Sequence, residues 1–283
     1  LKSMRIGLLI YEKFEEYMSA KKVLITGVSG LVGSAIYLHL AQWPDRYELY
    51  GMGRRRTNSE RILDEREIDI SSEKYFVGDI ADMDCVIRAV SGMDVVVHMA
   101  ADPAGRGWDS LQKNNIVGAY NIFEACKEAG VKRVVAASTI QVSTGNCESD
   151  PYRAIAEKRY EDVPENIPVV SSETIGQPRN LYAASKVWTE SLAQVYGHSH
   201  GMSSLCIRIG WVTGEDQPRG GRSDIWCSQY DIAELTRCCI EADPGLLFGI
   251  YYGMSKNKWC WVDMDNSANQ LGFEPKQSAE DFA

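Results

Sequence analysis

The sequence predicts an α/β protein with a Rossmann-type, doubly wound parallel sheet and a small discontinuous substrate-binding lobe. Short apolar runs alternate with longer helical patterns through the first 210 residues, as in folds whose helices cover both faces of a parallel sheet. Runs such as Val95-Val96-Val97 are continuous and β-branched, which is typical of parallel strands buried on both faces. At 283 residues and 45% apolar content, the chain can bury about three quarters of its unfolded surface.

The elements follow one another in a regular order. Predicted strands are 22–26, 47–52, 74–77, 94–99, 133–137 and 204–209, and the helices between them are 30–42, 82–90, 111–129 and 184–198. Residues 1–20 are expected to be an N-terminal extension, in which Met4 and Met18 are equally plausible natural starts. We expect a dinucleotide-binding domain over residues 21–210, with a loop excursion at 146–180. Residues 211–283 would form the substrate lobe and C-terminal segment.

Composition excludes several classes of function. A net charge of −9 and a pI of about 5.1 argue against a nucleic-acid surface, which needs clustered Lys and Arg. No apolar run approaches the roughly 20 residues of a membrane span, so no membrane association is expected. The eight cysteines include no C-x-x-C pair and no metal spacing with histidine, so they predict reduced core residues of a cytoplasmic protein without a metal site.

A glycine-rich turn follows the first predicted strand. In "VLITGVSGLVG", Gly27 permits the tight turn, Gly30 lets the backbone approach a pyrophosphate, and Gly33 lets the helix pack on the strand. The helix that starts at Leu31 and Val32 offers N–H groups and a partial positive charge to phosphates. Together with the strand–turn–helix order, this predicts dinucleotide binding.

The end of the second strand indicates which dinucleotide is preferred. An acidic residue there would bind the ribose 2′-hydroxyl and favour NAD, but this sequence has Gly53 and Arg54, followed by Arg55. Arginine suits a 2′-phosphate, whereas the same residues also suit a solvated basic turn. The sequence therefore favours NADP, with NAD as the alternative.

A tyrosine four residues before a lysine occurs three times, at Tyr17, Tyr182 and Tyr252. Residues i and i+4 share one face of a helix, and Tyr182 and Lys186 lie on a predicted helix. A free tyrosine has a pKa near 10, so a base at neutral pH needs neighbouring positive charge, and we expect the Lys186 ammonium and the positive nicotinamide together to lower the pKa of Tyr182. Spacing alone does not choose among the three pairs.

The chain resembles the extended short-chain dehydrogenase/reductase family, also called the NAD-dependent epimerase/dehydratase family. The resemblance covers about residues 21–265 and rests on Thr-Gly-x-x-Gly-x-x-Gly, "GDI" (78–80), "HMAA" (98–101), "NNIVG" (114–118), "AAST" (136–139) and "YAASK" (182–186). It selects Tyr182 and Lys186, because the other two pairs lie outside the register of these motifs.

The resemblance implies a role for individual residues. Tyr182 would move the substrate proton, Lys186 would also hold the nicotinamide ribose, and Thr139 would hydrogen-bond the reacting oxygen in place of the usual serine. The remaining implied contacts are Asp79 and Ile80 at the adenine, Ala100 and Ala101 beside the cofactor, and Asn115 as a brace of the active-site helix. Members commonly form homodimers through two helices, here 111–129 and 184–198.

The C-terminal part resembles the uronate dehydrogenase branch and its sugar- or sugar-phosphate-oxidising relatives, on "IRIGW", "IYYGMS" and "LGFEPKQSAEDF". That branch oxidises C1 of a cyclic aldose to a lactone. This sequence departs from the pattern of the branch at Ile140-Gln141, Trp211 and Pro103, which puts hexuronate itself in doubt. Candidate substrate residues are Gln141, Trp211 and, for a sugar carboxylate, Arg219 or Arg222.

Three classes of function remain open. The first is an NAD(P)-dependent oxidoreductase that acts on a sugar, uronate or sugar-phosphate hydroxyl, and the second is a nucleotide-sugar epimerase or dehydratase similar to UDP-glucose 4-epimerase. The third is a non-catalytic dinucleotide sensor, which the presence of Tyr182 and Lys186 disfavours. The short second half of the chain favours the first class, because relatives that bind nucleotide-sugars usually devote more chain to it.

Overall fold

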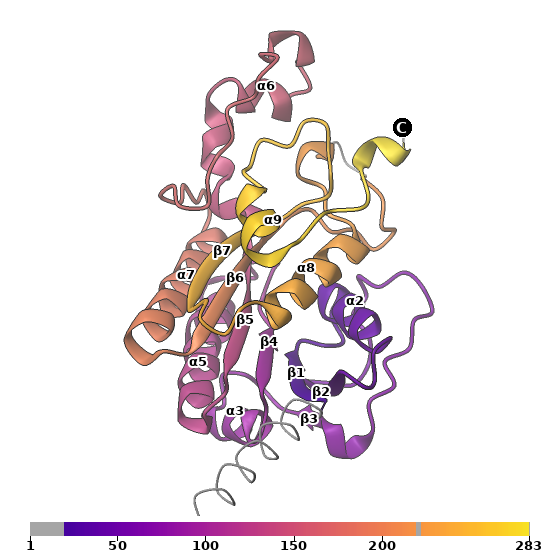
Figure 1. The fold of residues 1–283 in the computed structure, drawn as a ribbon, viewed down its shortest axis with the longest axis vertical. Coiled ribbons are helices and arrows are strands. Elements are labelled where there is room, and N and C mark those ends of the chain that lie inside the picture. Colours follow the sequence, from indigo (N-terminus) through magenta and orange to yellow (C-terminus); the bar gives the residue numbers. More distant parts are fainter. Residues whose placement is uncertain (1–19, 219–221, 283) are drawn as a thin grey trace, which may run out of the picture.

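The computed structural model describes residues 20–218 and 222–282. It contains a seven-stranded sheet in the order β3-β2-β1-β4-β5-β6-β7, in which every neighbouring pair is parallel (Figure 1). The predicted Rossmann-type, doubly wound parallel sheet is confirmed. The strands are β1 (Lys21–Thr26), β2 (Tyr47–Gly53), β3 (Tyr75–Val77), β4 (Val95–His98), β5 (Arg133–Thr139), β6 (Ser203–Ile209) and β7 (Phe248–Gly253).

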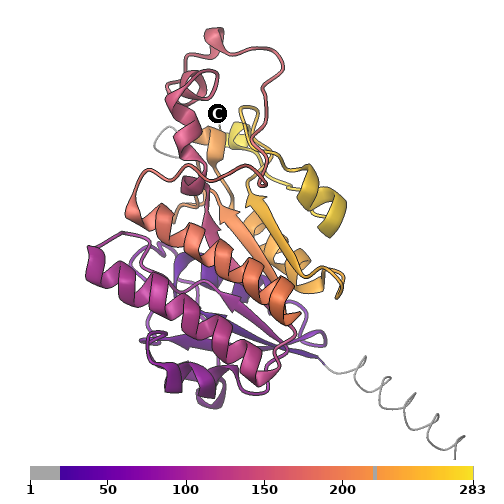
Figure 2. The ribbon, with the colours of Figure 1, turned by 90° about the vertical axis from the view of Figure 1, so that its left-hand side faces the viewer.

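Helices cover both faces of the sheet (Figures 1 and 2). On one face α3 packs on α5 and α5 on α7, and on the other α2 packs on α8. The α-helices are α2 (Leu31–Leu40), α3 (Met83–Val90), α4 (Trp108–Leu111), α5 (Gly118–Ala129), α6 (Tyr152–Ala156), α7 (Leu181–His200), α8 (Gln229–Glu241) and α9 (Asp265–Leu271). A π-helix (Gln112–Val117) joins α4 to α5, and 3₁₀ turns occupy Ser72–Lys74, Ile140–Val142, Thr144–Glu148, Tyr160–Asp162, Ser223–Ile225 and Ala279–Phe282.

Continuous apolar strands arise because alternate side chains enter two separate cores. On β1, Val23 and Ile25 pack in the core that contains Ile36 of α2, whereas Leu24 packs in the core that contains Ile122 of α5. All five side chains are fully buried. Each contributes about 1.5–3 kcal/mol relative to an exposed side chain, so both faces of the sheet must remain covered.

Strand β7 is absent from the sequence prediction. Its sequence FGIYYG contains two glycines, which lower strand propensity. The structure gives a reason for both: a Cβ on Gly249 would lie 2.4 Å from the Tyr251 hydroxyl, and a Cβ on Gly253 would lie 2.8 Å from Ile232 of α8. Residues 211–283 thus contribute β7 and α8 to the sheet and its covering layer. None of the helices in the described residues is long and apolar enough to cross a membrane.

The strand order places a topological switch point between β1 and β4, because the chain continues from β1 to β2 on one side and from β3 back to β4 on the other. In open α/β sheets, ligands bind outside the carboxyl ends of the strands at such a point. Thr26 ends β1 beside His98 at the end of β4. The sheet therefore directs the search for a site to this edge.

Candidate active site

The turn after β1 has a backbone that only glycine fits. Gly27 has a φ of +69°, and a Cβ there would lie 2.9 Å from the Ala100 nitrogen; a Cβ on Gly33 would lie 2.2 Å from the Gly27 carbonyl oxygen. The Gly30 N–H donates to that same oxygen at 2.9 Å. Helix α2 begins at Leu31 without a side-chain cap or an acidic residue in its first turn, a composition that suits a bound anion.

The switch point itself is lined by small and neutral groups. The Thr26 hydroxyl lies 2.9 Å from Nδ1 of His98 and accepts a hydrogen bond from the Ala100 N–H at 3.2 Å. Burial, assisted by the charge of Lys186, lowers the pKa of His98 to about 3, so the ring is neutral. Ala101 follows, half-buried.

Beyond the glycine turn, Asp79 and Ile80 follow the end of β3. Asp79 accepts the Ala81 N–H at 3.0 Å and pairs with the exposed Lys113 at 3.0 Å. Ile80 is buried against Gly118 of α5, whose absent Cβ would lie 2.6 Å from its side chain. Close packing at Gly118 therefore holds β3 against the helix layer.

At the end of β2, the side chains of Arg54 and Arg55 are exposed. The Arg55 carbonyl accepts a hydrogen bond from the Tyr75 hydroxyl at 2.7 Å, which fixes the backbone of this turn. Arg56 instead donates to the Ile70 carbonyl and lies over the Tyr75 ring, 4.9 Å from its centre. The structure therefore leaves Arg54 and Arg55 exposed at the end of β2.

The three predicted catalytic residues meet at the end of β5. Lys186 is buried and donates to the Ala137 carbonyl at 2.9 Å, and its nitrogen lies 6.0 Å from the centre of the Tyr182 ring. The Thr139 hydroxyl, also buried, hydrogen-bonds Tyr182. Asn180 caps α7 by accepting the Ala183 N–H at 2.8 Å, so the first turn of the helix presents Tyr182 to Thr139.

Burial sets the pKa values of Tyr182 and Lys186. It raises the pKa of Tyr182, although the Thr139 hydroxyl and the positive charge of Arg61 oppose the rise. It lowers the pKa of Lys186 to about 8. The expectation that Lys186 lowers the pKa of Tyr182 does not hold in this structure, because the ammonium group donates to Ala137 rather than to the phenol.

Asn115, the expected brace of the active-site helix, supports the first turn of α7 through Ser185 and Asp102, two partners that the sequence motifs did not indicate. Asn115 lies in the π-helix, donates to Ser185 at 2.9 Å and accepts the Asp102 N–H at 2.7 Å. The Ser185 hydroxyl in turn donates to the Tyr182 carbonyl at 2.7 Å. Single-turn π-helices are frequent at functional sites, but a π turn inside a helical pattern leaves no clear periodic signal.

The candidate substrate residues differ in their contacts. Gln141 accepts a hydrogen bond from Asn180 at 2.8 Å, and Trp211 is 47% exposed. Arg222 is engaged with Asp224 by two hydrogen bonds of 3.1 Å. Arg219 lies outside the described residues.

The other tyrosine–lysine pairs take no part in this arrangement. Tyr252 is fully buried in β7, where its hydroxyl contacts Ser143 at 2.8 Å and Arg208 at 3.0 Å, while Lys256 is exposed. Tyr17 lies outside the described residues.

Comparison with known proteins decides the family. The sequence profile of the NAD dependent epimerase/dehydratase family matches residues 23–263. The chain belongs to this family. The family assignment from the sequence motifs is therefore confirmed.

Relatives of this chain include proteins that are named as dehydrogenases of sugars or sugar derivatives. An NAD-dependent glucose-6-phosphate dehydrogenase of Haloferax volcanii is 31% identical over 268 residues, which cover 92% of this chain and 95% of the relative. A uronate dehydrogenase of Pseudomonas syringae pv. tomato is 27% identical and covers 92% and 84% of the two chains. These proteins support the predicted uronate dehydrogenase branch.

Solved structures agree with this assignment. A uronate dehydrogenase of Agrobacterium tumefaciens, a Y136A mutant complexed with NAD, has a TM-score of 0.72 at 25% identity and covers 93% of this chain and 87% of its own. A UDP-glucuronic acid 4-epimerase of Bacillus cereus in complex with NAD, with a TM-score of 0.66 at 19% identity over 92% and 95% of the two chains, shares the fold.

Proposed function

We propose that the chain is an NAD(P)-dependent dehydrogenase that oxidises a hydroxyl group of a sugar, a uronate or a sugar phosphate. The observation that carries the proposal is the meeting of Tyr182, Lys186 and Thr139 at the carboxyl edge, beside the glycine turn. Relatives that oxidise glucose 6-phosphate, uronates and L-arabinose, by their names, support the substrate class.

The residues of the turn fit a dinucleotide. The absence of Cβ atoms at Gly27, Gly30 and Gly33 lets the turn close tightly on itself and on Ala100 at the uncapped start of α2, so this turn would hold the pyrophosphate. When bound, the nicotinamide supplies the hydride acceptor. Asp79, Ala100 and Asn115 are the further contacts that we propose, with Leu31, Val32, Ile80 and Ala101 beside them.

The chain's own residues would handle the proton. Tyr182 takes the proton of the substrate hydroxyl, and the hydroxyl group of Thr139 orients the same oxygen. Lys186 binds the nicotinamide ribose. If the substrate is a cyclic aldose that reacts at C1, loss of this proton and of a hydride from C1 leaves a lactone.

For the cofactor, we propose that Arg54 and Arg55 bind a 2′-phosphate, so that NADP is accepted and preferred. Both are exposed and lie where an acidic residue would otherwise select NAD. NAD remains the competing possibility, because relatives are named as NAD-dependent or as using both. Measurement of kcat/KM with each cofactor for the wild type and for Arg54→Ala decides between them.

A screen tests the proposed function. Glucose 6-phosphate, glucuronate, galacturonate and L-arabinose are each mixed with NAD or NADP, and the absorbance of the reduced cofactor is followed. Reduction of the cofactor by one of these four compounds, together with loss of that activity in the Tyr182→Phe variant, supports the proposed dehydrogenase function. If none is oxidised while UDP-glucose is isomerised without net reduction of cofactor, the proposal fails in favour of the nucleotide-sugar epimerase.

We also propose a homodimer formed through α5 and α7. Apolar side chains on these helices and on the π turn before α5 are exposed: Val117 38%, Tyr120 43%, Leu181 60%, Trp188 39% and Val195 49%. Leu181, Trp188 and Val195 repeat every seven residues and form one stripe on α7.

The eight unpaired cysteines support a reducing compartment such as the cytoplasm.

A further inference from the structure

Several arginines in the described chain form ion pairs, for example Arg66 with Asp64, Arg208 with Glu190 and Arg222 with Asp224. Four other arginines between β2 and β3 differ. Within residues 20–218 and 222–282, no carboxylate forms an ion pair with Arg54, Arg55, Arg56 or Arg61. Of these, Arg61 donates to the loop that follows β6.

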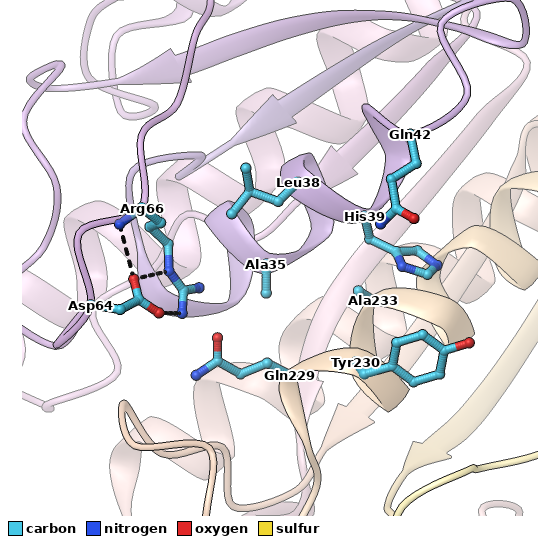
Figure 3. Close-up of a pocket in the computed structure, with 9 residues that line it drawn as sticks. All are labelled: Ala35, Leu38, His39, Gln42, Asp64, Arg66, Gln229, Tyr230 and Ala233. Carbon is cyan, nitrogen blue, oxygen red and sulfur yellow. Dashed lines mark hydrogen bonds and ion pairs between the residues drawn. The ribbon is translucent and has the colours of Figure 1, made fainter.

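Residues 59–66 connect the glycine turn to the substrate side of the site. At one end, the Ser59 N–H donates to the Ser29 carbonyl at 2.8 Å, inside the glycine turn. At the other, Arg66 lies 3.3 Å from the Ser34 hydroxyl and pairs with Asp64 beside a cavity of about 250 Å³ between α2 and α8 (Figure 3). Both ends of the segment are therefore held against α2.

Between these anchors, the segment touches the loop that follows β6. A Cβ on Gly214 would lie 2.4 Å from the Arg61 carbonyl oxygen and 2.9 Å from Leu63, so the two backbones are in contact. The Arg61 guanidinium donates to the Val212 carbonyl at 3.4 Å. Val212 follows Trp211, one of the candidate substrate residues.

The position of Arg61 also affects the chemistry. Burial raises the pKa of Tyr182, and the charge of Arg61, after the Thr139 hydroxyl, opposes that rise. An exposed guanidinium thus lies within electrostatic reach of the phenol, at a point between the glycine turn and the loop at Val212.

We propose that Arg61 binds an anionic oxygen group, a phosphate or a carboxylate, of the molecules that enter the Tyr182 site. Its planar fork of donors matches such groups, and one carbonyl contact leaves most of these donors available. The anion has two sources, the pyrophosphate of the dinucleotide and the anionic group of a substrate. This inference rests on the proposed function for the identity of those molecules.

Two titrations test the proposal without turnover: NAD with the free protein, and inorganic phosphate with the NAD-saturated protein, both by calorimetry. Variants are Arg61→Ala, Arg61→Lys and, as the control, Arg88→Ala, which removes an exposed arginine of α3. Loss of a charged hydrogen-bond partner weakens binding about tenfold or more, and we expect Arg61→Lys to be weakened less than Arg61→Ala.

Weaker NAD binding by Arg61→Ala assigns the residue to the dinucleotide, and weaker phosphate binding with unchanged NAD affinity assigns it to the substrate anion. Unchanged affinities in both titrations, with wild-type melting, overturn the proposal. Because neither measurement needs a substrate, the Arg61 inference can fail while dehydrogenase activity is found. The Arg61 inference can equally hold if the screen of sugars finds no dehydrogenase activity.

Discussion

Glu190 of α7 and Arg208 of β6 form a buried, two-pronged ion pair, with N–O distances of 2.8 and 2.9 Å and side chains 7% and 3% exposed. The Ser138 hydroxyl donates to Glu190 at 2.6 Å, and Arg208 donates to Tyr252 of β7. Glu190 lies one helical turn after Lys186. The pair therefore ties α7 to three neighbouring strands directly behind the predicted catalytic residues.

Removal of one partner of this pair should be costly. Glu190→Gln leaves the guanidinium buried without its counter-charge, and we expect a loss of about 3–5 kcal/mol in the free energy of unfolding. Urea denaturation followed by circular dichroism measures it. Asp150→Asn is the control, because Asp150 pairs with Arg153 at the surface and exposed pairs contribute about 0–1 kcal/mol. Equal losses in both variants would contradict the structural role of Glu190.

Tyr182 and Tyr252 share the same sequence pattern but should respond differently to loss of the hydroxyl. Tyr182→Phe should keep the wild-type melting temperature and lower kcat by about 10²–10⁴-fold, the range of general acid–base catalysis. Tyr252→Phe should keep turnover and lose about 1–3 kcal/mol of stability, because buried Ser143 and Arg208 lose a partner. Measurements of kcat and of urea midpoints on both variants check this. Comparable turnover by the two variants would be evidence against Tyr182 as the proton acceptor.

Gly33 offers a test of the glycine turn. Gly33→Ala places a Cβ 2.2 Å from the Gly27 carbonyl, so the turn must move, and we expect NAD binding to be lost. Gly92→Ala is the matched control: Gly92 has a φ of +73° with no atom within 4 Å of the added Cβ, so only about 1–2 kcal/mol of backbone strain is expected. Calorimetric titration with NAD compares the two. Wild-type NAD affinity in Gly33→Ala would remove the turn from the proposed cofactor site.

Local patterns explain why much of the site could be predicted. The glycine turn depends on residues within seven positions of one another, and Tyr182 and Lys186 lie one turn apart on one helix, so spacing along the chain reports their geometry. Family motifs then supplied Thr139, which no local pattern links to Tyr182. Strand β7 was missed because its two glycines lower strand propensity, and the contact of Gly253 with Ile232 of α8 is invisible in the sequence of the strand.

Long-range contacts explain the rest. Glu190 meets Arg208 only because α7 returns beside β6, and Arg61 approaches Tyr182 across more than a hundred residues of chain. Each is an ordinary charged residue in the sequence. The direction of the Tyr182 pKa was also missed, since burial opposes the effect of a neighbouring charge and burial is set by the whole fold.

The buried ammonium of Lys186 gives the last prediction, a pH dependence of stability. Its pKa of about 8 in the folded protein lies below the ordinary value of 10.5, so folding releases a proton between these pH values, and the folded state gains stability as pH rises from about 8 to 10.5. The full shift corresponds to about 3 kcal/mol. Lys186→Met removes it, so the stability of the wild type relative to this variant should rise over that range and stay constant below pH 7. Urea denaturation from pH 6 to 10.5 measures the difference, and Lys256→Met, an exposed lysine, is the control. A difference between wild type and Lys186→Met that does not change with pH would show that the ammonium is not desolvated.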